Sequence, residues 1–205
     1  MNFLFHMYLS GTDEEILVGN FMGDFVKGPL DGRFTHRVRQ GVELHRRIDS
    51  FAEGHPAFRS SRNRIASRYG RFRGIMVDMF YDHLLLNDWD KWSAEPWTRF
   101  TRRCRVAVQS HKAIIPQAMQ PLLPVIFDDL IPSYASVSGI GSALGRLSRR
   151  IGRQNPLAGG EIELARLHPE LLADFRSFAA DITVYAEELR GCYSCSERTF
   201  ARGDA

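Results

Sequence analysis

The most apolar stretch of the chain runs from Gly74 to Leu86, and its pattern predicts a buried helix. Apolar side chains recur there with helical spacing, at Val77, Phe80, Tyr81, Leu84 and Leu85. Only three residues of the stretch are ionisable: Asp78, Asp82 and His83. At about 100° per residue, the two aspartates stack one turn apart on one side of the helix, with His83 next to them.

Two carboxylates inside a protein core need a compensating positive charge. A buried carboxylate is costly unless it is paired, hydrogen-bonded or bound to a metal, and two stacked carboxylates repel each other. A metal ion between Asp78 and Asp82 is the simplest solution. In the alternative interpretation, both aspartates pair with arginines and His83 donates a hydrogen bond to a carbonyl group. This helix alone leaves both interpretations open.

Helical periodicity continues along the chain, which predicts an all-α protein. We expect helices over about 3–9, 12–28, 35–51, 74–87, 93–113, 136–151 and 169–190, with a turn-rich helix near 122–130. No segment alternates with period two, and no repeat of 20 to 50 residues occurs. The length suits one helical domain over residues 1–191, and we expect the tail from 192 to 205 to be frayed.

The second predicted helix carries polar groups and missing side chains on apolar faces. Asn20 and Asp24 lie four residues apart in the apolar segment 16–26, so their polar groups point into an apolar setting. Gly19 and Gly23 also lie one turn apart, although glycine disfavours helices. The glycines predict that another helix packs closely against this one.

The third predicted helix places His45 and Asp49 together on one face. Arg46 and Arg47 flank them, either as phosphate clamps or as salt-bridge partners. Ionisable residues on predicted apolar faces number seven, all before residue 84: His6, Asp24, His45, Asp49, Asp78, Asp82 and His83. Such a mixture of oxygen and nitrogen ligands suits Mn²⁺, Mg²⁺ or Fe²⁺ rather than zinc bound by thiolates.

Arginine dominates the positive charge of the chain. The net charge is only +3, but 24 of the 27 basic residues are arginine. Six of them occur between residues 58 and 73, where no acidic residue occurs: Arg59, Arg62, Arg64, Arg68, Arg71 and Arg73. Such a run is usually a solvated face, but it also predicts a binding surface for an anionic partner.

The remaining composition favours a cytoplasmic protein. No apolar run reaches the roughly 18 to 20 residues that a membrane span needs, so no membrane partner is expected. The apolar N-terminus lacks a basic leader and a cleavage site. Three cysteines, at 104, 192 and 195, cannot form a complete disulfide framework.

Four motifs in order resemble those of the acyl carrier protein phosphodiesterases, which are divergent all-helical relatives of the HD-domain metal phosphohydrolases. The motifs are Asn2-Phe-Leu-Phe-His6, Gly19-Asn-Phe-Met-Gly-Asp-Phe-Val-Lys-Gly28, Gly41-Val-Glu-Leu-His-Arg-Arg-Ile-Asp49 and Asp78-Met-Phe-Tyr-Asp-His83. The resemblance covers residues 1–90 through these motifs and continues more weakly to about residue 190.

The resemblance implies an HD-domain-like helical bundle. It also implies an enzyme that removes 4′-phosphopantetheine from holo acyl carrier protein, with Mn²⁺ as its metal and Mg²⁺ or Fe²⁺ as alternatives. The implied partner is an acidic carrier protein; nucleic acid is not expected, and the oligomeric state is left open. Such an enzyme acts in fatty acid and lipid metabolism.

The same resemblance implies the site residues. The expected metal ligands are Asp24, His45, Asp78, Asp82 and His83. The expected catalytic residues are His45, His83 and Arg46, and the expected substrate-binding residues are Arg46, Arg47, Arg59, Arg62 and Arg68. Ordinary HD domains read His then Asp, whereas residues 82 and 83 read Asp then His. The usual ligand assignment therefore cannot be copied to this chain.

Two alternatives stay open at this point. An HD-like hydrolase of a small nucleotide or alarmone needs arginines only at its pocket. A non-catalytic helical module that binds nucleic acid needs no metal, because its buried acids serve as internal salt-bridge partners.

Overall fold

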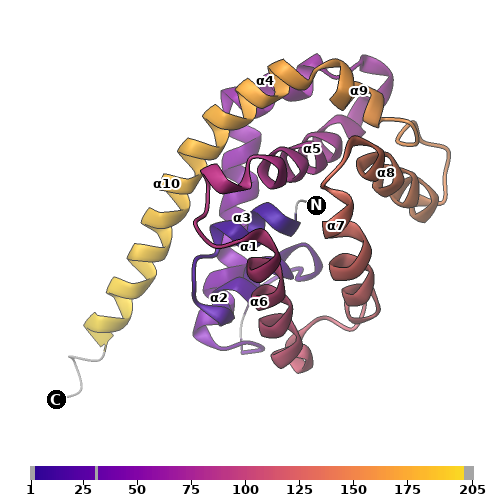
Figure 1. Cartoon of the computed structure of the whole chain (residues 1–205). Coiled ribbons are helices and arrows are strands. Elements are labelled where there is room, and N and C mark those ends of the chain that lie inside the picture. Colours follow the sequence, from indigo (N-terminus) through magenta and orange to yellow (C-terminus); the bar gives the residue numbers. More distant parts are fainter. Residues whose placement is uncertain (1–2, 31, 201–205) are drawn as a thin grey trace.

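The computed structural model describes residues 3–30 and 32–200 of the chain, and every regular element in that part is a helix. This confirms the all-α prediction (Figure 1). The α-helices are α1 (Phe3–Leu9), α2 (Glu14–Phe21), α3 (His36–Gly54), α4 (Pro56–Arg64), α5 (Arg73–Asn87), α6 (Trp97–Ser110), α7 (Ile131–Ser133), α8 (Val137–Ile151), α9 (Glu161–Arg166) and α10 (His168–Phe200). None of the helices described combines the length and apolar composition that a bilayer crossing needs.

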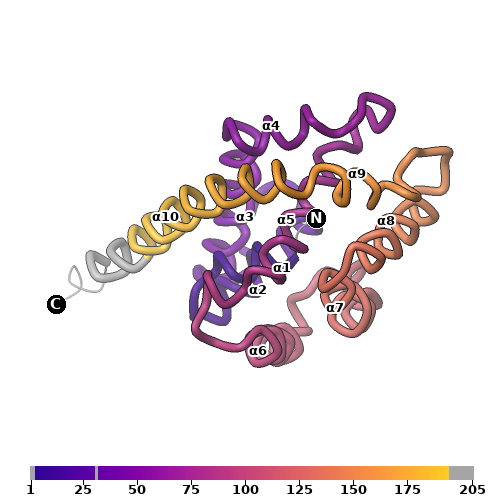
Figure 2. The backbone as a smooth tube through the Cα atoms, turned by 45° about the horizontal axis from the view of Figure 1, so that its top comes forward, coloured from indigo at the N-terminus to yellow at the C-terminus, as the bar shows by residue number. Residues whose placement is uncertain are grey.

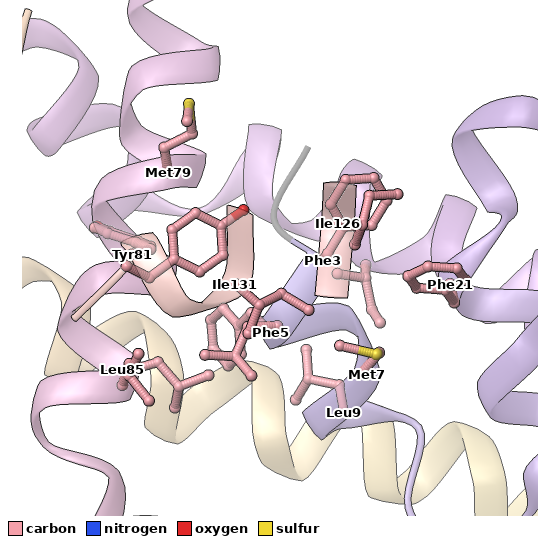
Figure 3. Packing of buried hydrophobic residues seen from close by; sticks show 14 of the residues in the cluster. Phe3, Phe5, Met7, Leu9, Phe21, Met79, Tyr81, Leu85, Ile126 and Ile131 are labelled. Carbon is pink, nitrogen blue, oxygen red and sulfur yellow. The ribbon is translucent and has the colours of Figure 1, made fainter. Parts of the chain in front are cut away.

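Helix α1 lies in the middle of the bundle and contacts α2, α5 and α10 (Figures 1 and 2). Its apolar side chains are almost completely buried, and Figure 3 shows Phe5 and Met7 packed among side chains of neighbouring helices. Because α1 is surrounded by other helices, its one polar residue, His6, is also buried.

The start of α1 also explains how Asp82, one of the two aspartates of α5, is accommodated in the core. Asp82 is completely buried, and its carboxylate accepts hydrogen bonds from the backbone amides of Phe5 at 2.9 Å and Leu4 at 3.2 Å. These amides are in the first turn of α1, where no helical carbonyl group can accept from them. Burial raises the pKa of Asp82 to about 8, although the two amides partly offset the effect.

Helices α2 and α3 cross in close backbone contact, as the glycine pattern predicts. A Cβ atom on Gly19 would lie 2.2 Å from the carbonyl oxygen of Val38, and one on Gly41 would lie 2.2 Å from the carbonyl oxygen of Ile16. Two glycines that face each other therefore bring the two backbones together. This contact fixes the distance between the helices that carry Asn20 and His45.

Helix α2 ends earlier than its apolar pattern predicts. The α-helix stops at Phe21 and a 3₁₀ turn, η1 (Gly23–Phe25), follows it, whereas the pattern predicts a helix to residue 28. Gly23 and Gly19 both disfavour continuing the helix. Asp24 consequently lies on the short turn rather than on a helix face.

Several predicted helix ends are confirmed by their caps. Thr35 accepts from the amide of Val38 at the start of α3, and Ser136 accepts from Gly139 at the start of α8. Gly152 ends α8 in the left-handed conformation at φ 70°.

The last helix differs from its prediction. Helix α10 continues past the expected end at residue 190 to Phe200. It extends away from the bundle (Figure 1). Tyr193 still packs against the core beyond that expected end, which gives the helix a reason to continue through Gly191. The expected frayed tail thus includes residues in a helix, and its part from 201 to 205 lies outside the described residues.

Replacing Gly19 with alanine should destabilise the protein by about 1–3 kcal/mol or more, because the new methyl group overlaps backbone atoms that cannot move aside. Urea unfolding measures the change. Gly191→Ala is the control, because beyond its chain neighbours and the adjacent backbone of its own helix the new Cβ would meet no atom of the described residues within 4 Å, and it should gain about 0.5–1 kcal/mol. A Gly19→Ala protein as stable as the wild type would contradict the close helix crossing.

Asp82→Asn should lower the free energy of unfolding by about 1–3 kcal/mol at pH 6, because an asparagine NH₂ group cannot accept from one of the two buried amides. A folded-state pKa above the unfolded value makes the stability contribution of Asp82 largest below pH 4, and it is lost as the pH rises through about 8. The difference between variant and wild type should therefore shrink at pH 9. A constant difference in urea unfolding from pH 6 to 9 would refute the buried neutral carboxyl group.

Candidate metal centre

Two histidine rings from different helices are held by one asparagine. His6 Nδ1 lies 2.8 Å from the side-chain oxygen of Asn20, and His45 Nδ1 lies 2.8 Å from its backbone oxygen. The Asn20 amide group donates to the backbone oxygen of His6 and to Ser10 Oγ, so its side-chain oxygen is the atom that faces His6. Both Nδ1 atoms must then donate, which leaves both Nε2 atoms free to bind a metal.

The two rings stack with their centroids 4.1 Å apart. Carboxylate oxygens lie close to the Nε2 atoms of both rings. Asp49 lies 3.3 Å from His6 Nε2 through one oxygen and 3.3 Å from His45 Nε2 through the other. Asp24 approaches His45 Nε2 to 3.6 Å. His6, His45 and Asp49 each offer a ligand atom, and these three atoms lie within 4.8 Å of one another.

The donor set fits a divalent metal ion. His45 Nε2 is buried and has no hydrogen-bond partner among the described residues, even though two carboxylates surround it. Buried polar atoms are rarely left without a partner, and metal sites are one place where it occurs. Two imidazole nitrogens with carboxylate oxygens are ligands that Mn²⁺ and Fe²⁺ bind well.

The local fold explains how His45 reaches this position. A Cβ atom on residue 23 would lie 2.2 Å from Cγ of His45, so only glycine leaves room for the ring. Arg46 donates to the carbonyl oxygens of Gly28 and Val26 and thereby holds the segment after η1 against α3. Asp24, on η1, is brought to His45 by these two contacts.

The electrostatics of the cluster favour a cation between its carboxylates. Burial alone lowers the pKa of His45, but its contacts with Asp24 and Asp49 outweigh burial and raise that pKa to about 9. The contact with His45 in turn lowers the pKa of Asp24 to about 2. Burial raises the pKa of Asp49, but its contacts with His45 and His6 outweigh burial and hold that pKa well below the usual range. A site that holds a proton this firmly also attracts a metal ion, which competes with that proton.

The cluster borders a cavity of about 590 Å³. His6, Asp24 and Asp49 line this cavity together with Asp78 from α5. Burial and the nearby Asp49 raise the pKa of Asp78. Three of the five predicted metal ligands, Asp24, His45 and Asp78, therefore gather at or directly behind one cavity.

Asp82 and His83 do not reach this cavity. Asp82 faces the backbone amides of α1, as described above. His83 Nδ1 lies 2.7 Å from the carbonyl oxygen of Tyr134 and 3.1 Å from the side chain of Asn87. The reason is their separation along the helix: Asp78 and Asp82 share a side of α5 but lie about one turn apart along its axis, so the cavity lies at Asp78 and the start of α1 lies over Asp82. The aspartates therefore do not form the expected pair around one cation, and the hydrogen bond of His83 matches the alternative interpretation.

The cavity also has basic residues in its lining, together with one further acid, Glu53. Arg62 of α4, Arg71 and Arg73 line it, together with Gly70 and Gly74. The 3₁₀ segment η2 (Ser67–Phe72) turns sharply at Gly70, with φ 50° and ψ −127°, a conformation that favours glycine. Arg73 Nε donates to the carbonyl oxygen of Gly70 at 3.1 Å and so stabilises this turn.

Of the arginines expected to bind substrate, only Arg62 lines the cavity. Arg46 is engaged with backbone oxygens, Arg47 pairs with Glu43 at 2.9 Å, and Arg59 donates to the carbonyl oxygen of Gly54. Arg68 lies 3.6 Å from Glu163. The expected role of Arg46 as a catalytic phosphate clamp is therefore not matched by its position, because its guanidinium group is turned toward residues 26–28.

The expected ligand set omits His6 and Asp49, two residues of the cluster. Both stand among the seven ionisable residues on apolar faces, so composition and periodicity do contain a signal. For Asp49 the signal is its spacing of four residues from His45. For His6 it is a single polar residue in the apolar helix α1, a feature that usually marks a structural histidine.

The comparisons with known proteins agree with the four motifs. The family model described as acyl carrier protein phosphodiesterase matches residues 1–182. A relative named acyl carrier protein phosphodiesterase from Photorhabdus laumondii is 29% identical over 180 residues, which cover 87% of this chain and 91% of the relative. A relative of the same name from Serratia proteamaculans is 28% identical over 192 residues, covering 92% of this chain and 98% of the relative.

A third relative of that name, from Escherichia coli O45:K1, is 34% identical over 111 residues, which cover 54% of this chain and 58% of the relative. No solved structure matches the chain significantly, so the likeness to HD domains stays a prediction. The family model covers most of the chain, and the first two relatives match over nearly their whole lengths. The chain therefore belongs to the acyl carrier protein phosphodiesterase family, a family of phosphoric diester hydrolases.

Proposed function

We propose that this protein hydrolyses the phosphodiester that joins 4′-phosphopantetheine to a serine of holo acyl carrier protein, and that it uses a divalent metal, Mn²⁺ foremost. One observation carries the proposal: a cavity that is lined both by residues of the histidine and carboxylate cluster and by arginines. The names of the relatives supply the substrate class. Family membership overturns the alternative of a non-catalytic binding module.

In this proposal His6, His45 and Asp49 hold the metal, and Asp24 and Asp78 border it. The metal, when bound, lowers the pKa of a coordinated water and neutralises charge on a phosphoryl oxygen. Asn20 keeps both imidazoles in the tautomer that directs Nε2 toward the cavity. Arg62, Arg71 and Arg73, which line the same cavity, bind the remaining phosphate oxygens and orient the phosphodiester beside the metal ligands.

The arginines outside the cavity have a separate role in the proposal. Arg59 and Arg68 are exposed, and they lie on α4 and η2, the elements that supply Arg62 and Arg71. An acidic carrier protein that presents its prosthetic group to the cavity would meet this surface. Long-range attraction of this kind speeds association and weakens with salt.

Adding Mn²⁺ to the chelated protein should raise its melting temperature. At a metal concentration one hundred times the Kd, binding stabilises a protein by about 2.7 kcal/mol, which shifts the melting temperature of a chain this size by roughly 5–10 °C. Asp49→Asn should abolish most of this shift and lower hydrolysis of holo carrier protein by about 100-fold or more, because ligand changes cost more than the 10-fold to 100-fold typical of outer-shell changes.

The matched control is Asp181→Asn, which changes another aspartate in contact with a histidine, His55 at 3.0 Å, outside the cavity. This variant should keep both the metal shift and the turnover. An equal loss of the metal-induced shift and of turnover in the two variants, or an Asp49→Asn protein with normal turnover, would show that the metal does not bind at the proposed site. Faster hydrolysis of phosphorylated nucleotides than of holo carrier protein by the wild type would favour the nucleotide hydrolase instead.

Arg62→Gln and Arg71→Gln should each lower kcat/KM by about 10-fold to 100-fold, because a hydrogen bond to a charged group contributes about 1.5–3 kcal/mol. The loss should be the same for holo carrier protein and for bis(p-nitrophenyl) phosphate, since both substrates place a phosphodiester in the cavity. Arg59→Gln with Arg68→Gln should instead raise KM for the carrier protein alone and flatten its salt dependence. Arg99→Gln, which changes an arginine with 82% exposure on α6, is the control. If Arg59→Gln with Arg68→Gln affects both substrates equally, these two arginines do not form a binding surface for the carrier protein.

A further inference from the structure

A second pocket lies on a different part of the molecule, between α8 and the segment before it. That segment contains the π-helical turn η6 (Val125–Leu130) and α7. Residues of α1 and α5 complete the pocket, and Figure 3 labels three of its apolar members, Phe3, Met79 and Ile126. No residue that lines this pocket lines the metal cavity.

The interior of the second pocket is apolar and small. Its volume is about 130 Å³, close to that of an engineered cavity of 150 Å³ that binds benzene. Its apolar residues are Phe3, Met79, Leu122, Val125, Ile126, Leu130, Ala143 and Leu147. A medium-length aliphatic chain fits this volume, whereas a long acyl chain or a protein helix does not.

Two arginines and a tyrosine accompany this apolar surface, with no acidic residue in the lining. Arg146 Nη2 is buried and has no hydrogen-bond partner among the described residues. The Tyr134 hydroxyl is also buried, but it lies beside the carboxyl group of Asp82: burial and then Asp82 raise the pKa of Tyr134. Arg150, one turn further along α8, is exposed and lines the same pocket. An unpartnered buried donor next to a second positive charge favours an anionic acceptor.

We infer that this pocket binds a medium-chain aliphatic carboxylate such as octanoate. The chain lies among the apolar residues, and Arg146 and Arg150 receive the carboxylate. The π-helical turn supports this assignment, because such turns are rare and frequently occur at functional sites. The inference does not depend on the proposed hydrolysis, because the two cavities share no residue.

Glu161 is the acidic residue of the protein itself that competes with a bound carboxylate for Arg146. It lines a groove together with Arg146 on the outer side of α8, and its Oε2 atom is also buried without a hydrogen-bond partner among the described residues. If the Arg146 side chain turned toward Glu161, it would lose its contact with a carboxylate in the pocket. Removing the charge of Glu161 should therefore leave octanoate binding as strong as before or strengthen it.

Isothermal titration of the full chain with sodium octanoate and with 1-octanol tests the inference. Octanoate should bind with a stoichiometry of one and at least ten-fold more tightly than the neutral alcohol. Arg146→Gln with Arg150→Gln should weaken octanoate binding at least ten-fold, and Glu161→Gln not at all. Arg149→Gln, which changes a neighbouring exposed arginine outside this pocket, is the matched control.

Val125→Glu keeps the test decisive if the arginine variants fold poorly. Val125 lines the pocket and is 41% exposed, so a carboxylate there is tolerated by the fold and repels the ligand, with an expected loss of at least ten-fold. Hydrolysis of holo carrier protein should be unchanged in all these variants. No saturable octanoate binding, or equal binding of octanoate and octanol, would overturn the inference.

Discussion

The geometry of the candidate site depends on Asn20. Its side-chain oxygen and its backbone oxygen each accept from one imidazole, and its amide group is held by α1. The residue that orients both rings thus sits on α2, between the two helices that carry them. Its position is itself set by the glycine contact between α2 and α3, because any larger residue at 19 or 41 would separate the helices. The hydrogen bonds of Asn20 and the glycine contact between α2 and α3 therefore determine where both Nε2 atoms point.

Opposite charges in the lining of one cavity give the site its chemical character. The carboxylates concentrate negative charge beside two imidazoles, so they favour a cation; the arginines favour an anion. A metal ion and a phosphate group can then both be bound without leaving either charge unpaired. Either set of charges buried alone would be unstable, because an isolated buried charge is costly.

The arginines of the chain divide into groups by their partners. Many are engaged with acids or with backbone oxygens, as Arg47 is with Glu43 and Arg46 is with Gly28. Others line a cavity without an acid beside them in its wall, as Arg146 does in the apolar pocket. Exposed pairs contribute little to stability, so the number of arginines says less than their surroundings. The surroundings, rather than the local density of arginine, mark the positions that suit an anionic ligand.

The sequence by itself determined the all-α class, most helix starts, the close packing at Gly19, and the pool of seven ionisable residues from which the site is drawn. These features are local: capping, periodicity and propensity act within one or two turns of a helix. Four motifs in order also indicated the family.

Only the tertiary structure decided which members of that pool meet. Periodicity puts Asp78 and Asp82 on one side of α5, but it cannot show that the start of α1 lies over Asp82 while the cavity lies over Asp78. It likewise cannot bring His6 to His45, because they are 39 positions apart and their contact depends on how α1, α2 and α3 cross. The physical reason is that a helical pattern specifies the face of a residue, whereas the partner of that face is set by packing between helices distant in the chain.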